Sequence, residues 1–84
     1  MRITLKLFAT LEKYLPAARD AHNAARVEVA DGASVAEVLR GFGVPPEEVH
    51  LVLLDGRFVP PDTLEDVRLE EGRTLAVWPP VAGG

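Results

Sequence analysis

Residues 31–46 read DGASVAEVLRGFGVPP and specify an amphipathic helix together with both of its ends. Ser34 and Glu37 form a capping box, in which each side chain accepts a hydrogen bond from a free backbone N–H at the helix start. Apolar residues then recur at helical spacing: Val35, Val38, Leu39 and Phe42. Gly41 or Gly43 can adopt the left-handed conformation that ends a helix, and the two prolines that close the stretch prevent its continuation. The apolar stripe predicts that this helix packs on a sheet.

Five other stretches have the patterns of β-strands. They are residues 2–8, 26–29, 51–54, 57–59 and 74–78. The first, second and last alternate between the two faces, whereas the third, LVLL, is apolar throughout. Asp55-Gly56 suits a two-residue hairpin turn between the third and fourth strands.

The order of these elements predicts the fold class. Leu11, Tyr14 and Leu15 recur at helical spacing, so a short helix and a loop are expected between the first two strands. The order strand, strand, helix and three strands indicates an α+β domain, with a mixed sheet packed on one main helix. The β-grasp architecture matches this order. We expect residues 1–78 to form the domain and residues 79–84 to form a flexible tail.

Composition and charge exclude several functions. Apolar residues make up 48% of the 84-residue chain and charged residues 26%, a balance that can bury one core. Nine Lys and Arg against thirteen Asp and Glu give a net charge of −4, which argues against nucleic-acid binding. The first residues interleave charged and apolar side chains, unlike a signal peptide or membrane span. A cytoplasmic protein that binds no membrane is therefore expected.

The chain offers few groups for catalysis of its own. It has no cysteine, so a disulfide, a thiolate metal site and a cysteine nucleophile are excluded. His22 and His50 are far apart and lack companions at ligand spacing, so we predict no metal site. A domain of this size also has little room for a deep substrate pocket, which argues against an enzyme that acts alone.

Three aromatic residues are predicted to face outward from the sheet. Phe8 and Trp78 fall on strand faces that are otherwise mostly polar. If Phe58 joins them across neighbouring strands, the three form an aromatic patch of the kind that binds protein partners. Alternatively, these rings are covered by loops or pack at the edge of the sheet.

The chain ends Pro79-Pro80-Val81-Ala82-Gly83-Gly84. The prolines end the sheet ladder and favour an extended course, so the last four residues can reach about 13 Å from the body. Glycines lack Cβ atoms and can pass through a narrow channel. This ending can therefore bring a terminal carboxylate into the active site of another protein.

With this ending, the sequence resembles the small subunit of molybdopterin synthase and related β-grasp sulfur carriers. The resemblance covers nearly the whole chain and rests on the ending above, on Lys6-Leu7-Phe8-Ala9 and on the turn Leu69-Glu70-Glu71-Gly72. The thiamine-pathway carrier shares the Gly-Gly end but usually lacks the double proline, so the resemblance favours the molybdopterin branch.

The resemblance implies a mechanism and two partners. In that family, a ubiquitin-activating-type adenylyltransferase uses ATP to adenylate the terminal carboxylate, and sulfur from a cysteine desulfurase displaces AMP to leave a thiocarboxylate. Gly84 would carry this group, beside Gly83, with no permanently bound cofactor. The tail would then enter the large molybdopterin synthase subunit, in a heterotetramer, where the sulfur forms the dithiolene of molybdopterin. Phe8, Phe58, Trp78, Pro79, Pro80 and Val81 would contact these partners.

Two positions depart from the family pattern. Asp55-Gly56 stands where members often have Asn-Gly, and Gly72-Arg73 stands where they often have Gly-Asp. Asp-Gly also suits a two-residue turn, so the first change is compatible with the fold. The second changes the charge beside the expected partner surface.

Three other functions stay open from the sequence. The chain can be a ubiquitin-like modifier joined through Gly84 to lysines of other proteins, because adenylation is common to both activities. It can instead carry sulfur to thiamine, a tRNA base or an amino acid. A plain interaction module with an inert tail is the third alternative.

Overall fold

Strands β1 (Arg2–Leu7) and β5 (Thr74–Trp78) run parallel at the centre of a five-stranded sheet in this computed structural model, which describes residues 1–81. The sheet order is β2-β1-β5-β3-β4, and every other pairing is antiparallel. The remaining strands are β2 (Ala24–Glu28), β3 (Leu51–Leu54) and β4 (Arg57–Phe58). This mixed sheet confirms the predicted α+β, β-grasp class.

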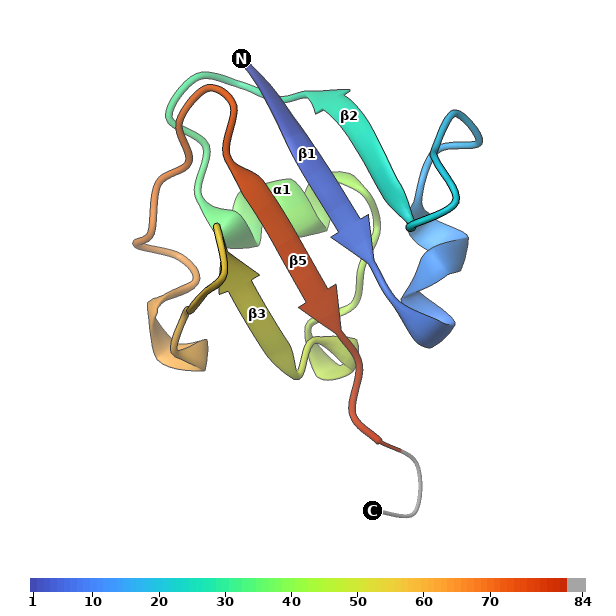
Figure 1. Cartoon of the computed structure of the whole chain (residues 1–84). Helices are drawn as coiled ribbons and strands as arrows, with labels where there is room; N and C mark the ends of the chain where they lie inside the picture. The colour runs from blue at the N-terminus through green and yellow to red at the C-terminus, as the bar shows by residue number, and fades with distance from the viewer. Residues whose placement is uncertain (82–84) are drawn as a thin grey trace.

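One α-helix, α1 (Val35–Gly41), crosses the sheet on a single face (Figure 1). The capping box is present: Ser34 Oγ accepts from the Glu37 N–H at 3.1 Å, and Glu37 Oε1 accepts from the Ser34 N–H at 2.9 Å. Gly43, with φ +80°, is the residue that takes the left-handed conformation after the helix. The predicted helix and its ends are therefore confirmed, and Gly43 rather than Gly41 supplies that conformation.

The core lies between α1 and the sheet. β1 and β5 supply its centre, because their inward side chains are fully buried: Ile3, Leu5, Leu7, Leu75 and Val77. Val35, Val38 and Leu39 of α1 cover them. The alternating apolar residues predicted in the first and last strands thus point into this core, and the residues between them point to the opposite face of the sheet.

The predicted helix at residues 11–15 is instead a 3-10 helix, η1 (Ala9–Tyr14). Its hydrogen bonds join residues three apart, from the Leu11 N–H to the Phe8 carbonyl and from the Leu15 N–H to the Glu12 carbonyl, both at 3.0 Å. Short segments often take this tighter form. Leu11 and Leu15 are buried, so the apolar spacing reflected packing and not the α-helical period.

Other boundaries differ by one or two residues. β1 ends at Leu7, because Ala9 turns the chain with φ 53°, and β2 covers Ala24–Glu28 where residues 26–29 were predicted. Two further 3-10 helices, η2 (Pro46–Glu48) and η3 (Pro61–Thr63), start at the proline pairs. No helix within residues 1–81 is long and apolar enough to cross a membrane.

Candidate docking face and tail root

The face of the sheet opposite α1 has an aromatic pair at its lower end. The rings of Phe8 and Trp78 stack with centroids 4.5 Å apart and planes 12° apart. The parallel register of β1 and β5 places them side by side, because Leu7 pairs with Val77. Both side chains are half-buried. The prediction that these two aromatic residues share the outer face is confirmed.

The backbone around Trp78 is held by the residue that follows β1 and by the residue that precedes β3. The Phe8 N–H donates to the Val77 carbonyl at 3.1 Å, and the His50 N–H donates to the Trp78 carbonyl at 2.9 Å. Pro79 and Pro80, which have no N–H, follow directly. The sheet therefore ends at Trp78, at a point secured by two hydrogen bonds and one ring stack.

Phe58 lies on the same face but farther from the tail than the sequence indicated. It pairs with Leu53 of β3, which pairs with Ala76 of β5, whereas Trp78 pairs with Leu51 in the next row. Two strand spacings separate Phe58 from β5, or about 10 Å. Phe58 is 58% exposed, and within residues 1–81 the only stacked ring pair is that of Phe8 and Trp78.

Leucines connect the aromatic residues. Leu51 and Leu53 project from the outer face of β3 and are half-buried, and Ala76 between them and β1 is buried. We call this surface the outer apolar face; it consists of Phe8, Leu51, Leu53, Phe58, Ala76 and Trp78. Sequence reasoning missed both leucines as surface residues. The unbroken run LVLL at residues 51–54 was the signal that could have identified them. A strand with one solvated face normally alternates apolar and polar residues, so a run without polar residues indicates apolar side chains on both faces.

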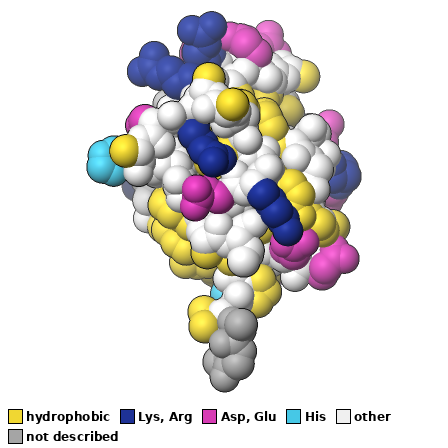
Figure 2. Space-filling model, turned by 90° about the vertical axis from the view of Figure 1, so that its right-hand side faces the viewer, with side chains coloured by type: hydrophobic (Ala, Val, Ile, Leu, Met, Phe, Trp, Pro, Cys, Tyr) yellow, Lys and Arg dark blue, Asp and Glu magenta, His cyan; other side chains and the backbone are white. Residues whose placement is uncertain are grey.

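The chain beyond β5 leaves the body beside this face. Pro79 is half-buried, whereas Pro80 and Val81 are exposed, Val81 to 77%. Hydrophobic side chains gather where this segment projects (Figure 2). The predicted sulfur-carrying residues Gly83 and Gly84 lie outside the described residues, so their role stays a prediction.

A hydrogen bond joins the two 3-10 helices η1 and η2. The Tyr14 hydroxyl donates to Glu48 Oε2 at 3.1 Å. Desolvation of the phenol, and then its bond to the carboxylate, raise the pKa of Tyr14 above its ordinary value. The hydroxyl therefore stays protonated at neutral pH and acts as a structural donor.

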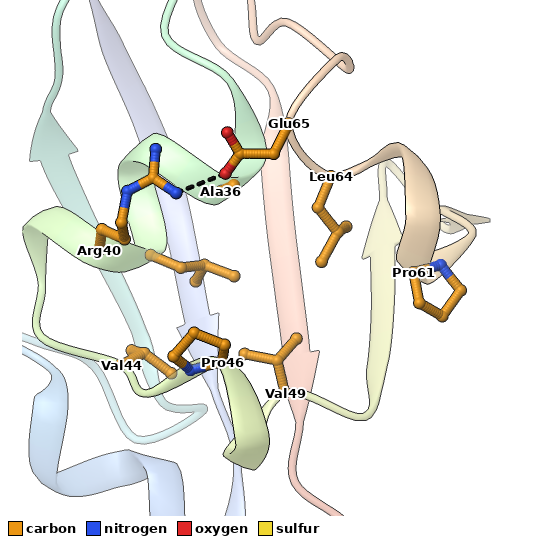
Figure 3. A pocket seen from close by; sticks show the side chains of 9 residues that line it. Ala36, Arg40, Val44, Pro46, Val49, Pro61, Leu64 and Glu65 are labelled. Carbon is orange, nitrogen blue, oxygen red and sulfur yellow. Dashed lines mark hydrogen bonds and ion pairs between the residues drawn. The ribbon is translucent and has the colours of Figure 1, made fainter.

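An apolar cavity of about 260 Å³ lies on the helix side of the sheet (Figure 3). Leu39 of α1, Val49 after η2 and Leu64 after η3 line it, and an ion pair between Arg40 and Glu65 crosses its rim. It holds no group of His, Asp or Glu side chains suited to a metal, and no such cluster of three or more occurs in residues 1–81. His22 and His50 are both exposed.

The sheet order and the single crossing helix define a ubiquitin-like β-grasp domain. The sequence identifies the family within this fold class. The chain belongs to the Mut7-C ubiquitin family, which matches residues 1–83. No curated protein matches it at a significant level.

Solved structures share this fold. The HVO 2177 protein of Haloferax volcanii is 28% identical with a TM-score of 0.75, over 100% of this chain and 87% of that one. SAMP1 of the same organism is 23% identical with a TM-score of 0.64, over all of both chains. A putative molybdopterin converting factor subunit 1 of Pyrococcus furiosus is 19% identical with a TM-score of 0.65, over 95% and 98%. A thiamine biosynthesis protein, ThiS, of Geobacter metallireducens and a complex of subunits 1 and 2 of the molybdopterin-converting factor of Helicobacter pylori also contain the fold.

Proposed function

We propose that this chain is a sulfur carrier that works through the carboxylate of Gly84, as the small subunit of a molybdopterin synthase. One observation carries the proposal: β5 leads directly from the outer apolar face into Pro79-Pro80-Val81, which projects from the body. The fold thus couples a surface suited to a protein partner with a segment that can enter that partner's active site.

The chemistry requires two activation steps supplied by another protein. A carboxylate is a poor acyl donor, so one of its oxygens first attacks the α-phosphorus of ATP and pyrophosphate leaves. Hydrosulfide, or a donor equivalent to it, then attacks the acyl carbon, AMP leaves, and the thioacid loses its proton. The resulting thiocarboxylate is anionic and nucleophilic at neutral pH. In this scheme Gly84 is a cosubstrate, and the adenylyltransferase and the large subunit provide the catalytic groups.

The names of similar structures support the class of function more than the pathway. They include a molybdopterin converting factor subunit 1 and a complex of the two converting-factor subunits, and these favour a large-subunit partner. The thiamine biosynthesis protein supports sulfur transfer to thiamine as an alternative. We favour the molybdopterin pathway because the chain has Pro79-Pro80 before its last residues, which the thiamine-pathway carrier usually lacks.

A second candidate is a ubiquitin-like modifier. It is favoured by the likeness to a small archaeal modifier protein of Haloferax volcanii, which is 23% identical. Such a modifier would undergo the same adenylation, but a lysine amine of a target protein would displace AMP and form an isopeptide bond.

Intact mass spectrometry of the protein from its native cells separates these candidates. A carrier is expected to show one terminal oxygen replaced by sulfur, whereas a modifier is expected in covalent adducts of higher mass. Incubation of the purified protein with the adenylyltransferase, ATP and a sulfur donor should give the same thiocarboxylate. Removal of Gly84 should abolish this product with no change in the unfolding curve. Retained sulfur transfer in the truncated variant would overturn the proposal.

A further inference from the structure

Strand β4 has an open edge at which one residue offers both of its backbone groups. The Val59 N–H donates to the Val52 carbonyl at 2.9 Å, so Val52 and Val59 are a hydrogen-bonded pair. Such pairs alternate with non-bonded pairs along an antiparallel ladder, and Leu53 with Phe58 is therefore a non-bonded pair. The N–H and C=O of Phe58 consequently point away from β3, and β4 is the last strand of the sheet.

A groove of about 650 Å³ lies along this edge. Leu54, Val59 and Val67 are its half-buried or buried apolar lining. The charged residues that border it are Asp55, Arg57, Arg68, Glu70 and Arg73. Because side chains alternate along a strand, Arg57 and Val59 lie on the helix side of the sheet and Phe58 lies on the outer apolar face. A strand added beside Phe58 would therefore place its neighbouring side chains over Arg57 and Val59.

The groove has an unbalanced positive charge. Both of its carboxylates are engaged by Arg73, whose guanidinium donates to Asp55 at 2.7 Å and to Glu70 at 2.6 Å. Arg68 donates to the Gly32 carbonyl and to Glu37. Arg57 forms no ion pair within residues 1–81 and is exposed. A chain of net charge −4 thus presents an available guanidinium beside an apolar lining at a strand edge.

We propose that this groove binds an extended, acidic peptide segment of a partner protein by strand addition to β4. The segment runs antiparallel to β4, and its central residue exchanges two backbone hydrogen bonds with Phe58. The residue before the centre is apolar and lies over Val59, and the residue after it is Asp or Glu and pairs with Arg57. The inference concerns a surface separate from the tail and does not rest on the proposed sulfur chemistry.

The charge and the length of the edge favour a peptide over a second copy of this chain. A second β4 would add another Arg57 to a groove that is already positive. Pro60-Pro61 follows at once, and Pro cannot donate to a ladder, so an edge formed by two copies would end after the Phe58 pair. A free peptide brings neither a second Arg57 nor a second proline pair, so only Pro60 of this chain limits the ladder, on one side of the Phe58 pair.

The test is an NMR titration of the full, isotope-labelled chain with the peptide acetyl-Thr-Val-Tyr-Glu-Thr-amide. We expect saturable shifts centred on the amides of Phe58 and its neighbours, including Arg57. Replacement of the peptide Glu by Lys should weaken binding roughly tenfold, the effect of losing a charge-assisted hydrogen bond. Methylation of the Tyr nitrogen should abolish binding, because that N–H donates to the Phe58 carbonyl.

Exchanging the charges of Arg57 and of the peptide Glu separates specific pairing at Arg57 from a general electrostatic attraction between peptide and protein. Arg57→Glu should weaken the Glu peptide roughly tenfold and restore binding of the Lys peptide. Arg26→Glu, the same charge change on the exposed side of β2 at the opposite edge, should leave both affinities unchanged. Equal binding of the Glu and Lys peptides, or shifts that avoid Phe58, would overturn the proposal. Shifts at Phe58 that depend on protein concentration without peptide would show a second copy at this edge, and would also contradict it.

Discussion

Asp55 and Arg73 form an ion pair that joins the β3–β4 turn to the start of β5. The Arg73 guanidinium donates to Asp55 Oδ2 at 2.7 Å, while the Thr74 N–H donates to Asp55 Oδ1 at 2.8 Å. These are the two positions at which the sequence departs from the pattern of the carriers it resembles. The structure shows that they contact each other, so the two departures together form one ion pair. Arg73 is therefore part of a turn and is not an unpaired charge beside the outer apolar face.

This pair predicts a pH dependence of stability. The hydrogen bond that the Asp55 carboxylate accepts from Arg73 lowers the pKa of Asp55 below its ordinary value of 3.8. The bond that it accepts from the Thr74 N–H lowers it further. Because the folded pKa is the lower one, the unfolded chain binds more protons in this range, and stability rises with pH. The contribution of Asp55 is therefore present above 3.8 and is lost as the pH falls through the folded pKa.

Asp55→Asn should accordingly lower the urea midpoint at neutral pH, and its difference from the wild type should shrink well below pH 3.8. Asp62→Asn is the control, because Asp62 is exposed in η3 and forms no ion pair within residues 1–81. A difference between Asp55→Asn and the wild type that stays constant with pH would contradict the role assigned to the pair.

Phe8→Ala should change the fluorescence of Trp78, the single tryptophan. The indole loses the ring stacked at 4.5 Å and gains contact with water, so its emission should shift to longer wavelength. The lost stack should also cost about 1 kcal/mol of unfolding free energy beyond the lost burial. Phe58→Ala should leave the emission unchanged, because Phe58 lies two strands away from β5. An equal shift of the emission in both variants would show that Phe58 affects Trp78 as much as Phe8 does, which would contradict this arrangement of the strands.

Ser34→Ala should lower the free energy of unfolding by about 1 kcal/mol, the usual cost of losing a helix cap. Ser34 is fully buried, and its hydroxyl accepts from the Glu37 N–H. Urea unfolding curves measure the loss. Ser34→Thr, which keeps the hydroxyl, should be less destabilised, and the reverse order would argue that packing and not the cap is responsible.

Alanine substitutions at Gly41 and Gly43 should differ in their effect on stability. Gly43 has φ +80°, so Gly43→Ala should destabilise the protein by about 1 kcal/mol. Gly41 is the last residue of α1, has no positive φ and has no atom within 4 Å of the position of an added Cβ. Gly41→Ala should therefore be neutral or stabilise by up to about 1 kcal/mol. Thermal unfolding of both variants checks this contrast.

Phe58→Asp should weaken docking on the outer apolar face without unfolding the protein, because Phe58 is 58% exposed. Interface aromatic residues commonly carry much of the binding energy, so calorimetry with either proposed partner, the adenylyltransferase or the large subunit, should show a loss of affinity of roughly tenfold or more. Gly41→Asp adds the same charge on the helix side and should not affect binding. Undiminished affinity of Phe58→Asp would exclude this part of the face from the interface.

The sequence by itself determined the elements whose signals are local. The capping box, the helical stripe and the glycine after the helix lie within a few residues of one another, so α1 and its ends could be predicted. The Asp55-Gly56 hairpin was also predicted, and the structure gives both residues the positive φ that such a turn needs. Alternation likewise separated the inward Leu75 and Val77 from Trp78.

Only the tertiary structure decided which distant residues meet. Strand alternation assigns a face to each side chain, but the row it occupies depends on strand order and register. The parallel pairing of β1 with β5 brings Phe8 against Trp78, whereas β3 lies between β5 and β4 and keeps Phe58 apart. The same arrangement brings Arg73 to Asp55. These contacts join residues 18 to 70 positions apart, and a pattern within one segment carries no information about its neighbours in the sheet.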